Sequence, residues 1–112
     1  MTIGRTIFGT MVVLMSATPA MASSATGKIA TLRTRATDGL QIVTIQGTHS
    51  GSPACATYDY FMIRDEKSDA GKAQFAMLMA AFLSGKAVTI DGSGSCQRWG
   101  DGEDIATVSY VE

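Results

Sequence analysis

Hydrophobic and polar positions along the chain change their spacing near residue 68. Before that point, three segments alternate between the two kinds of residue and are rich in β-branched or aromatic side chains, which predicts strands over residues 28–36, 40–47 and 54–64. Two further strand-like segments cover residues 86–92 and 105–111. The Asp-Gly pair within Thr37–Gly39 predicts a hairpin turn between the first two strands.

One stretch, near residues 70–84, has the composition of a helix. Residues 73–83 are almost all strong helix formers. Ser68 or Asp69 can cap the N-terminus, and Gly85 is typical of a C-terminal stop. The sequence therefore predicts a single helix between the third and fourth strands.

The predicted elements follow one another as β-β-β-α-β-β. Five strands with a helix after the third is the chain order of the OB-fold, a small and partly open five-stranded barrel. We therefore expect a mainly β domain with one helix, built as a five-stranded OB-fold barrel. An α+β sandwich with the same chain order is the alternative.

The predicted helix is hydrophobic around nearly its whole circumference. Its large apolar side chains cannot all face one side of a helix; they are Phe75, Met77, Leu78, Met79, Phe82 and Leu83. A small barrel covers only one side, so the other side is expected to contact a second copy of the chain. This predicts a homo-oligomer and places Phe75, Met79 and Phe82 at the interface. The alternative is a monomer whose alanine-rich helix surface tolerates water.

The N-terminal residues have the pattern of a secretory signal peptide. Arg5 precedes the apolar stretch Ile7–Met15, and Ala20-Met21-Ala22 has the small residues of a cleavage site. The stretch is shorter than the roughly 20 apolar residues that a membrane-spanning helix needs. We expect residues 1–22 to be a signal peptide, residues 23–112 to form one domain, and the product to be secreted or periplasmic without stable membrane insertion.

The charge of the chain narrows the classes of partner that it is expected to bind. The chain has 10 acidic residues and 9 Lys or Arg, and one of the latter, Arg5, leaves with the leader. Nucleic-acid binders usually show a basic patch, so a nucleic-acid partner is not expected.

Cys55 and Cys96 are expected to form a disulfide, because an exported protein meets an oxidising compartment. Two free thiols are the alternative.

The sequence has no motif for catalysis or metal binding. His49 is the only histidine, so the sequence contains no His-His or Cys-His zinc spacing. The acids Asp101, Glu103 and Asp104 are close together on a predicted turn, where acids are usually solvated. We expect a protein that is not an enzyme and that has no metal ion and no cofactor.

A binding role is favoured by the loop SGSCQRWGDGED, residues 93–104. Trp99, the only tryptophan, follows Cys96 closely, and an aromatic ring held by a disulfide loses little entropy when a ligand binds. Sugars offer apolar C–H faces for stacking and hydroxyl groups for hydrogen bonds. The candidate ligand-binding residues are Trp99, Arg98, Gln97, Asp101 and Glu103. The alternative is that Trp99 fills one end of the barrel.

Residues 53–92 resemble the middle of the binding subunit of subtilase cytotoxin-like bacterial toxins. The shared pattern is a Cys-Ala pair that opens a strand, a polar link, an apolar helix and then Ser-Gly-x-x-Val-x-Ile; the matching residues here are Cys55, Ala56, Ser84, Gly85, Val88 and Ile90. The chain also resembles many small secreted bacterial proteins of unknown role, which share an ending like its Trp-Gly-Asp-Gly-Glu-Asp sequence. The resemblance is therefore to toxin binding subunits and related small secreted OB-fold proteins.

This resemblance implies an OB-fold, a ring of five copies with helices lining the centre, and binding of host glycans. The sugar-binding residues of the toxin subunit lie outside the matched segment, so none is carried over, and the loop with Trp99 departs from that family. The function expected is a secreted or periplasmic, non-enzymatic binding subunit that recognises a glycan or a surface protein. The alternative is a monomeric periplasmic structural or protein-interaction domain.

Overall fold

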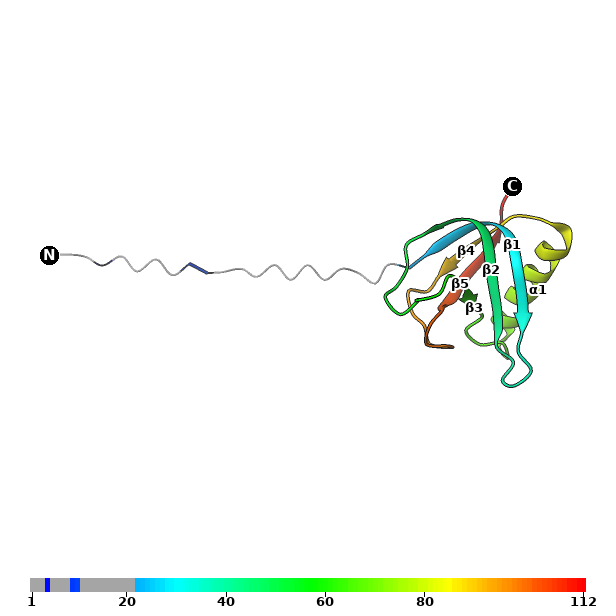
Figure 1. Cartoon of the computed structure of the whole chain (residues 1–112), viewed down its shortest axis with the longest axis horizontal. Helices are drawn as coiled ribbons and strands as arrows, with labels where there is room; N and C mark the ends of the chain where they lie inside the picture. Colours follow the sequence, from blue (N-terminus) through cyan, green and yellow to red (C-terminus); the bar gives the residue numbers. More distant parts are fainter. Residues whose placement is uncertain (1–3, 5–8, 11–21) are drawn as a thin grey trace.

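The described part of the chain consists of five strands and one helix in the predicted order (Figure 1). The elements are β1 (Ser24–Thr34), β2 (Gln41–Ser50), β3 (Phe61–Met62), α1 (Asp69–Ser84), β4 (Val88–Gly92) and β5 (Glu103–Tyr110). The structure is a computed structural model that describes residues 4, 9–10 and 22–112. The predicted signal peptide, residues 1–22, lies almost entirely outside these residues. Within them, no helix is both long enough and apolar enough to cross a membrane.

The five strands form one sheet that closes on itself in the order β1-β2-β3-β5-β4. β1 closes the ring because it pairs with β2 along its whole length and with β4 through its first residues, 24–27. β3 and β5 run parallel to each other, and every other neighbouring pair is antiparallel. The predicted mainly β fold with one helix is therefore confirmed.

Two glycines allow β1 and β2 to approach each other where the sheet bends. Gly27 and Gly47 are register partners, with φ angles of 154° and 142°. A Cβ on Gly27 would overlap the carbonyl oxygen of Gln46, and one on Gly47 would overlap that of Thr26. Any side chain would therefore force these strands apart, and glycine is the residue that strong sheet curvature requires.

The hydrophobic core lies between the closed sheet and α1. Its buried members come from all five strands, the segment after β3 and the helix; they are Ala25, Ile29, Val43, Phe61, Ile63, Leu78, Ala81, Val88, Ile90 and Ile105. In β4 the burial alternates, so that Val88, Ile90 and Gly92 face inward. This is the period of two expected for a strand with one face on the core.

The helix begins and ends where the sequence predicts. Ser68 is the N-cap, and its hydroxyl accepts a hydrogen bond from the backbone nitrogen of Gly71 at 3.0 Å. Gly85 is the C-cap in the left-handed conformation, with φ of 68°. Such a conformation favours glycine because it lacks a Cβ.

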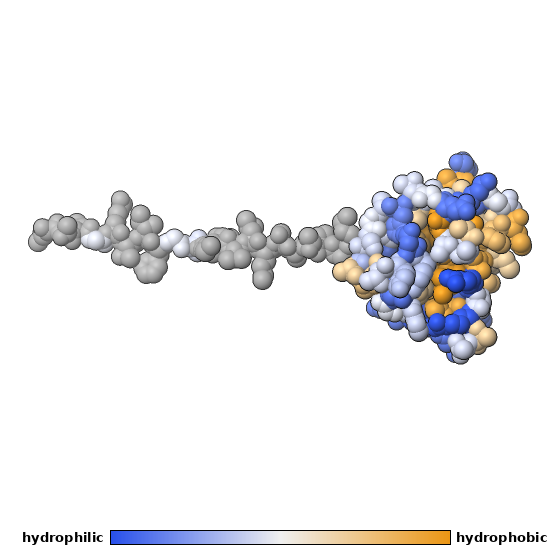
Figure 2. All heavy atoms as spheres, in the orientation of Figure 1, coloured by the Kyte–Doolittle hydropathy of each residue, from blue (hydrophilic) through white to orange (hydrophobic). Residues whose placement is uncertain are grey.

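The outer side of α1 remains apolar in the single chain. Met79 and Phe82 are exposed, as the predicted interface requires, and Leu83 is exposed to 78%. Phe75 instead is partly buried and packs against the core, so it is a poorer interface residue than expected. Figure 2 shows hydrophobic atoms on the side of the domain that carries α1.

Several strand boundaries differ from the prediction. β1 begins at Ser24 rather than residue 28, because Ser24–Gly27 pairs with both β2 and β4 despite its loop-like composition. β2 likewise extends through His49 to Ser50. The third strand contains only Phe61–Met62, and residues 54–60 before it form a loop. Pairing across the ring, rather than local composition, sets these boundaries.

Candidate functional site

The loop of residues 93–102, between β4 and β5, is shaped by the buried carboxylate of Asp104. One carboxylate oxygen accepts a hydrogen bond from the backbone nitrogen of Gln97 at 2.8 Å, and the other accepts one from that of Arg98 at 3.0 Å. The backbone nitrogen of Asp104 donates to the carbonyl oxygen of Ser95 at 2.9 Å. Asp104 is fully buried, contrary to the solvated acid that the sequence predicts. Since these bonds lie just before Trp99, they hold the backbone that carries it.

The predicted disulfide is present and holds the same loop from the other side. Cys55 and Cys96 are bonded, with their Cα atoms 6.1 Å apart. The bond joins the loop before β3 to the loop before β5, two segments separated by 41 residues. The free-thiol alternative is therefore wrong, and Trp99 lies three residues beyond a covalent cross-link.

Trp99 lies at the surface and contacts the hairpin between β1 and β2. The guanidinium carbon of Arg35 lies 4.3 Å from the centre of the indole ring, within the range of a cation–π interaction. Trp99 is 41% exposed, so it does not fill the end of the closed sheet. The hairpin and the Trp99 loop are thus joined at one end of the domain.

Arg35 is held in position by Asp38 within the hairpin. Its Nε and Nη2 atoms donate to the two carboxylate oxygens of Asp38 at 2.9 Å and 2.6 Å. The side-chain hydrogen bond from Arg35 lowers the pKa of Asp38 well below its usual range and raises that of Arg35. Asp38 also accepts a hydrogen bond from the backbone nitrogen of Leu40. The cation on the indole ring is therefore fixed by a bidentate pair.

Arg98 joins three segments rather than projecting toward a ligand. Its Nε and Nη2 atoms donate to the carboxylate of Glu66, both at 3.0 Å, and Nη2 also donates to the carbonyl oxygen of Asp38 at 3.1 Å. The hydrogen bond from Arg98 lowers the pKa of Glu66. The guanidinium is mostly covered and already has protein partners, so Arg98 links the loop that carries Trp99 to Glu66 and to the hairpin between β1 and β2.

Two tyrosines and Asp101 extend the surface toward the loop before β3. The rings of Tyr58 and Tyr60 are stacked, with centres 5.4 Å apart and planes within 3°. The hydroxyl of Tyr60 donates a hydrogen bond to the carboxylate of Asp101. The pKa of Tyr60 is raised to about 12; burial of the hydroxyl is the largest cause, and this hydrogen bond is the second. Tyr58 is 61% exposed, so its ring lies at the surface and not in the core.

These residues define one candidate surface, which we call the Trp99 surface; it consists of Arg35, Tyr58, Tyr60, Trp99 and Asp101. A hollow of about 340 Å³ lined by Arg33, Thr34, Arg35 and Ile42 shares Arg35 with it. Two exposed aromatic rings and a half-buried carboxylate are thus held by rigid contacts at this surface. Such an arrangement can stack on a flat apolar face and form hydrogen bonds at its edges.

The two remaining predicted ligand residues, Gln97 and Glu103, lie in different environments. Gln97 is exposed, and its backbone is held by Asp104. Glu103 is only 1% exposed, and its carboxylate accepts hydrogen bonds from the backbone nitrogens of Ser23 and Gly94. Its expected place on the ligand-binding surface is therefore wrong, because β5 begins at Glu103 and turns this side chain inward.

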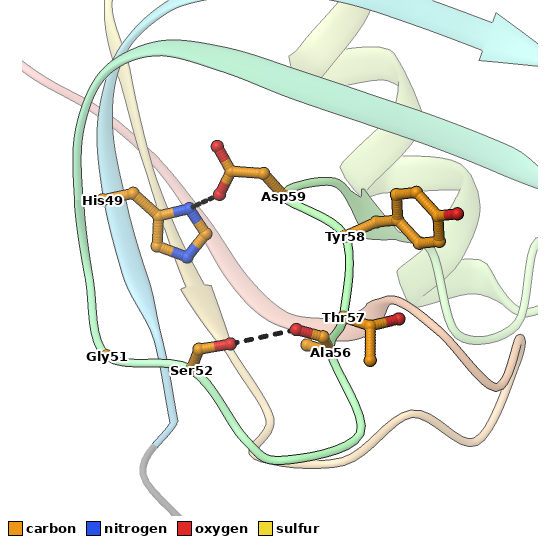
Figure 3. A pocket seen from close by; sticks show the side chains of 7 residues that line it. All are labelled: His49, Gly51, Ser52, Ala56, Thr57, Tyr58 and Asp59. Atoms are coloured by element: carbon orange, nitrogen blue, oxygen red, sulfur yellow. Dashed lines mark hydrogen bonds and ion pairs between the residues drawn. The ribbon is translucent and has the colours of Figure 1, made fainter.

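A second hollow, of about 420 Å³, lies beside the end of β2 (Figure 3). The carboxylate of Asp59 points toward His49 and pairs with its Nδ1 atom. The imidazole also stacks on Phe61, with ring centres 5.3 Å apart. Ser52, which lines the same hollow, donates to the carbonyl oxygen of Ala56 rather than to His49. The pair therefore joins β2 to the loop before β3, and the sequence offered no indication that Asp59 is the partner of His49.

Sequence reasoning missed Arg35 and Tyr60 as parts of the surface. The predicted chain order contained the necessary signal, because the first hairpin and the loop between the last two strands lie beside the same face of an OB-fold. Arg35 precedes the predicted hairpin turn at Thr37–Gly39, and Trp99 lies in the last loop. The chain order therefore indicated that the hairpin and the last loop lie near each other, but not that Arg35 contacts the indole of Trp99.

Searches against protein-family models, curated proteins and solved structures found no match for this chain.

Proposed function

We propose that this protein is an exported, non-enzymatic OB-fold subunit that binds carbohydrate at the Trp99 surface. The strand order β1-β2-β3-β5-β4, the parallel β3–β5 pair and a helix between β3 and β4 support the OB-fold. Closure of the sheet favours this fold over a layered α+β sandwich. In the OB-fold, the face of strands 2 and 3 and the loops between strands 1 and 2 and between strands 4 and 5 bind oligonucleotides or oligosaccharides, and the Trp99 surface includes residues of both loops.

The exposed indole of Trp99 is the observation that carries the proposal. Arg35 contacts its ring, the disulfide and Asp104 hold its loop, and 41% of the residue is still exposed. So large an apolar ring usually stabilises a domain more when it is buried than when it is left in water. A rigidly held ring at the surface is therefore suited to stack on the C–H face of a sugar at low entropic cost.

The groups around Trp99 suit a neutral, hydroxyl-rich ligand better than a polyanion. Arg35 and Arg98 are paired with Asp38 and Glu66, so most of their charge is already balanced. The second carboxylate oxygen of Asp101 and the exposed amide of Gln97 offer hydrogen-bond partners. Asp101 is already engaged by Tyr60, which supports binding rather than acid–base chemistry.

The proposed protein is also exported and associates with other copies of itself. The leader pattern of residues 1–22 supports secretion or transfer to the periplasm. The exposed side chains of Met79, Phe82 and Leu83 support association of several copies through α1. A ring of subunits would present several Trp99 surfaces together and raise the avidity for a multivalent glycan.

A glycan-array screen of the exported protein tests the carbohydrate-binding part. Trp99→Ala is expected to reduce binding roughly thirtyfold, because loss of a tryptophan at the centre of an interface typically costs about 2 kcal/mol or more. Tyr110→Ala is the matched control, since Tyr110 is similarly exposed but belongs to β5 and donates to the carbonyl oxygen of Met77 on the helix. Equal binding by wild type and Trp99→Ala would refute the site.

The alternative function is a monomeric interaction domain in which Trp99 and Tyr58 contact a protein partner. The exposed aromatic pair supports this function too, because tryptophan and tyrosine are enriched at protein interfaces. Light scattering separates the two quaternary states. A single species of monomer mass at micromolar concentration, with no hits on the array, favours the alternative.

A further inference from the structure

The carboxylate of Glu103 occupies a small buried site at the beginning of β1. One of its oxygens accepts hydrogen bonds from the backbone nitrogen of Ser23 at 3.1 Å and from that of Gly94 at 2.8 Å. The other accepts a hydrogen bond from the Ser23 hydroxyl. Ser23 and Glu103 are exposed to only 2% and 1%, so both residues are removed from water.

The surrounding backbone is built to hold this pair. The carbonyl oxygen of Ser23 accepts a hydrogen bond from the backbone nitrogen of Gly92 at 2.7 Å. A Cβ on Gly92 would overlap the Glu103 carboxylate, so only glycine leaves room for it. Ser23 is thus fixed at both its nitrogen and its carbonyl group, with the nitrogen directed at Glu103.

Glu103 has no cationic partner among the described residues of the full chain. Each ion pair found there involves another acid: Asp38, Asp59 or Glu66. The side chain that follows, Asp104, is a second buried carboxylate. Burial of a carboxylate whose hydrogen-bond donors are all neutral is costly, and a nearby positive charge would offset that cost.

Removal of the leader would supply this charge at the nitrogen that already faces Glu103. Hydrolysis of the Ala22–Ser23 peptide bond by an export-linked peptidase consumes one water molecule. It leaves a carboxylate on Ala22 and an amine on Ser23, and the amine takes up a proton because a free α-amino group has a pKa near 7.7–8.0. We infer that cleavage after Ala22 is a maturation step in which the new α-ammonium group of Ser23 forms a buried ion pair with Glu103 and stabilises the closed sheet.

The ion pair requires cleavage at the Ala22–Ser23 peptide bond and not at a neighbouring one. A chain that begins at Ala22 carries its charge one residue earlier, about 3.8 Å along the backbone, where the residue is exposed. Ser23 would then keep a neutral peptide nitrogen. The inference rests on the leader removal included in the proposed function, but it does not depend on what the Trp99 surface binds.

Three forms of the protein test the inference. All strands and the whole core lie within residues 23–112, so the exported chain beginning at Ser23 contains the complete fold. It is compared with a chain beginning at Ala22 and with an N-acetylated Ser23 chain, which keeps the nitrogen–hydrogen bond donor but lacks the charge. The Ser23 chain is expected to have a folding equilibrium constant at least about tenfold larger than either of the others in urea titrations.

Glu103→Gln in each form completes a double-mutant cycle, and the tenfold difference is expected to disappear in that background. If Glu103→Gln does not fold, the comparison of the free and acetylated Ser23 chains still decides the question. Equal stability of those two chains overturns the inference. Mass spectrometry of the exported protein is a second criterion, and a mature N-terminus at any other residue also overturns it. Glycan binding is measured separately, so its failure is distinguishable from failure of the ion pair.

Discussion

Asp104→Asn should destabilise the protein far more than its small change in shape suggests. Each of the two carboxylate oxygens of Asp104 accepts a hydrogen bond from a different backbone nitrogen, those of Gln97 and Arg98. Asparagine has one oxygen, so one of these nitrogens would face an NH₂ group, which is also a donor. The backbone cannot rotate to relieve this conflict, because the disulfide holds the loop at Cys96.

The expected loss is about 2.5–4 kcal/mol of unfolding free energy. A hydrogen bond to a charged acceptor contributes roughly 1.5–3 kcal/mol, and an unsatisfied buried donor costs about 1–3 kcal/mol. The lower part of the combined range applies because the two backbone nitrogens are only partly buried. This is a large share of the roughly 5–15 kcal/mol that is typical of a small domain.

Urea unfolding measured by Trp99 fluorescence is a direct assay, since Trp99 is the only tryptophan. Asp91→Asn is the matched control. Asp91 also accepts two hydrogen bonds, but from the hydroxyls of Ser24 and Thr107, which can rotate to accept from an amide. The control should cost less than about 1 kcal/mol. If Asp104→Asn costs no more than Asp91→Asn, the backbone nitrogens do not depend on Asp104 as described.

Three further predictions concern the disulfide, the acid response and the helix. Cys55→Ser should lower the unfolding free energy by roughly 2–4 kcal/mol and make Cys96 reactive toward a thiol reagent; an unreactive Cys96 would contradict this. Because the pKa of Glu66 is lowered in the folded state, its contribution to stability is present above its ordinary value of 4.5 and is lost as the pH falls through the folded value. Glu66→Gln should therefore flatten the acid side of the stability–pH curve, and an unchanged curve would refute this linkage. Replacing Met79 and Leu83 by lysine should convert the proposed oligomer to a monomer in light scattering without a change in circular dichroism, and an unchanged mass would exclude this face as the interface.

Only some of the ligand-binding residues expected from the sequence are free to contact a ligand in the folded protein. Trp99 and Asp101 are conspicuous in the sequence because of their chemistry and their place near a cysteine in a chain with a predicted leader. Arg98 and Glu103 are conspicuous for the same reason, yet both turn toward the protein interior or its own loops. Residue type and proximity in sequence indicate which side chains could bind a ligand, but not which are already occupied by other parts of the fold.

Features that depend on near neighbours in the chain could be predicted from the residues alone. Ser68 and Gly85 delimit the helix, because capping involves groups within a few residues. The Asp-Gly hairpin, the chain order and the pairing of Cys55 with Cys96 were equally accessible. Each of these follows from local backbone preferences or, for the disulfide, from the expectation of an oxidising compartment.

Contacts between distant segments depend instead on how the whole sheet closes. Closure converts Ser24–Gly27 from an apparent loop into strand and brings Ser23 to Glu103, 80 residues away. It also places Arg35 on the indole of Trp99. The physical reason is that strand pairing and the burial of charge are satisfied across the whole ring, so the partner of each group is set by its position in space and not by the residues beside it.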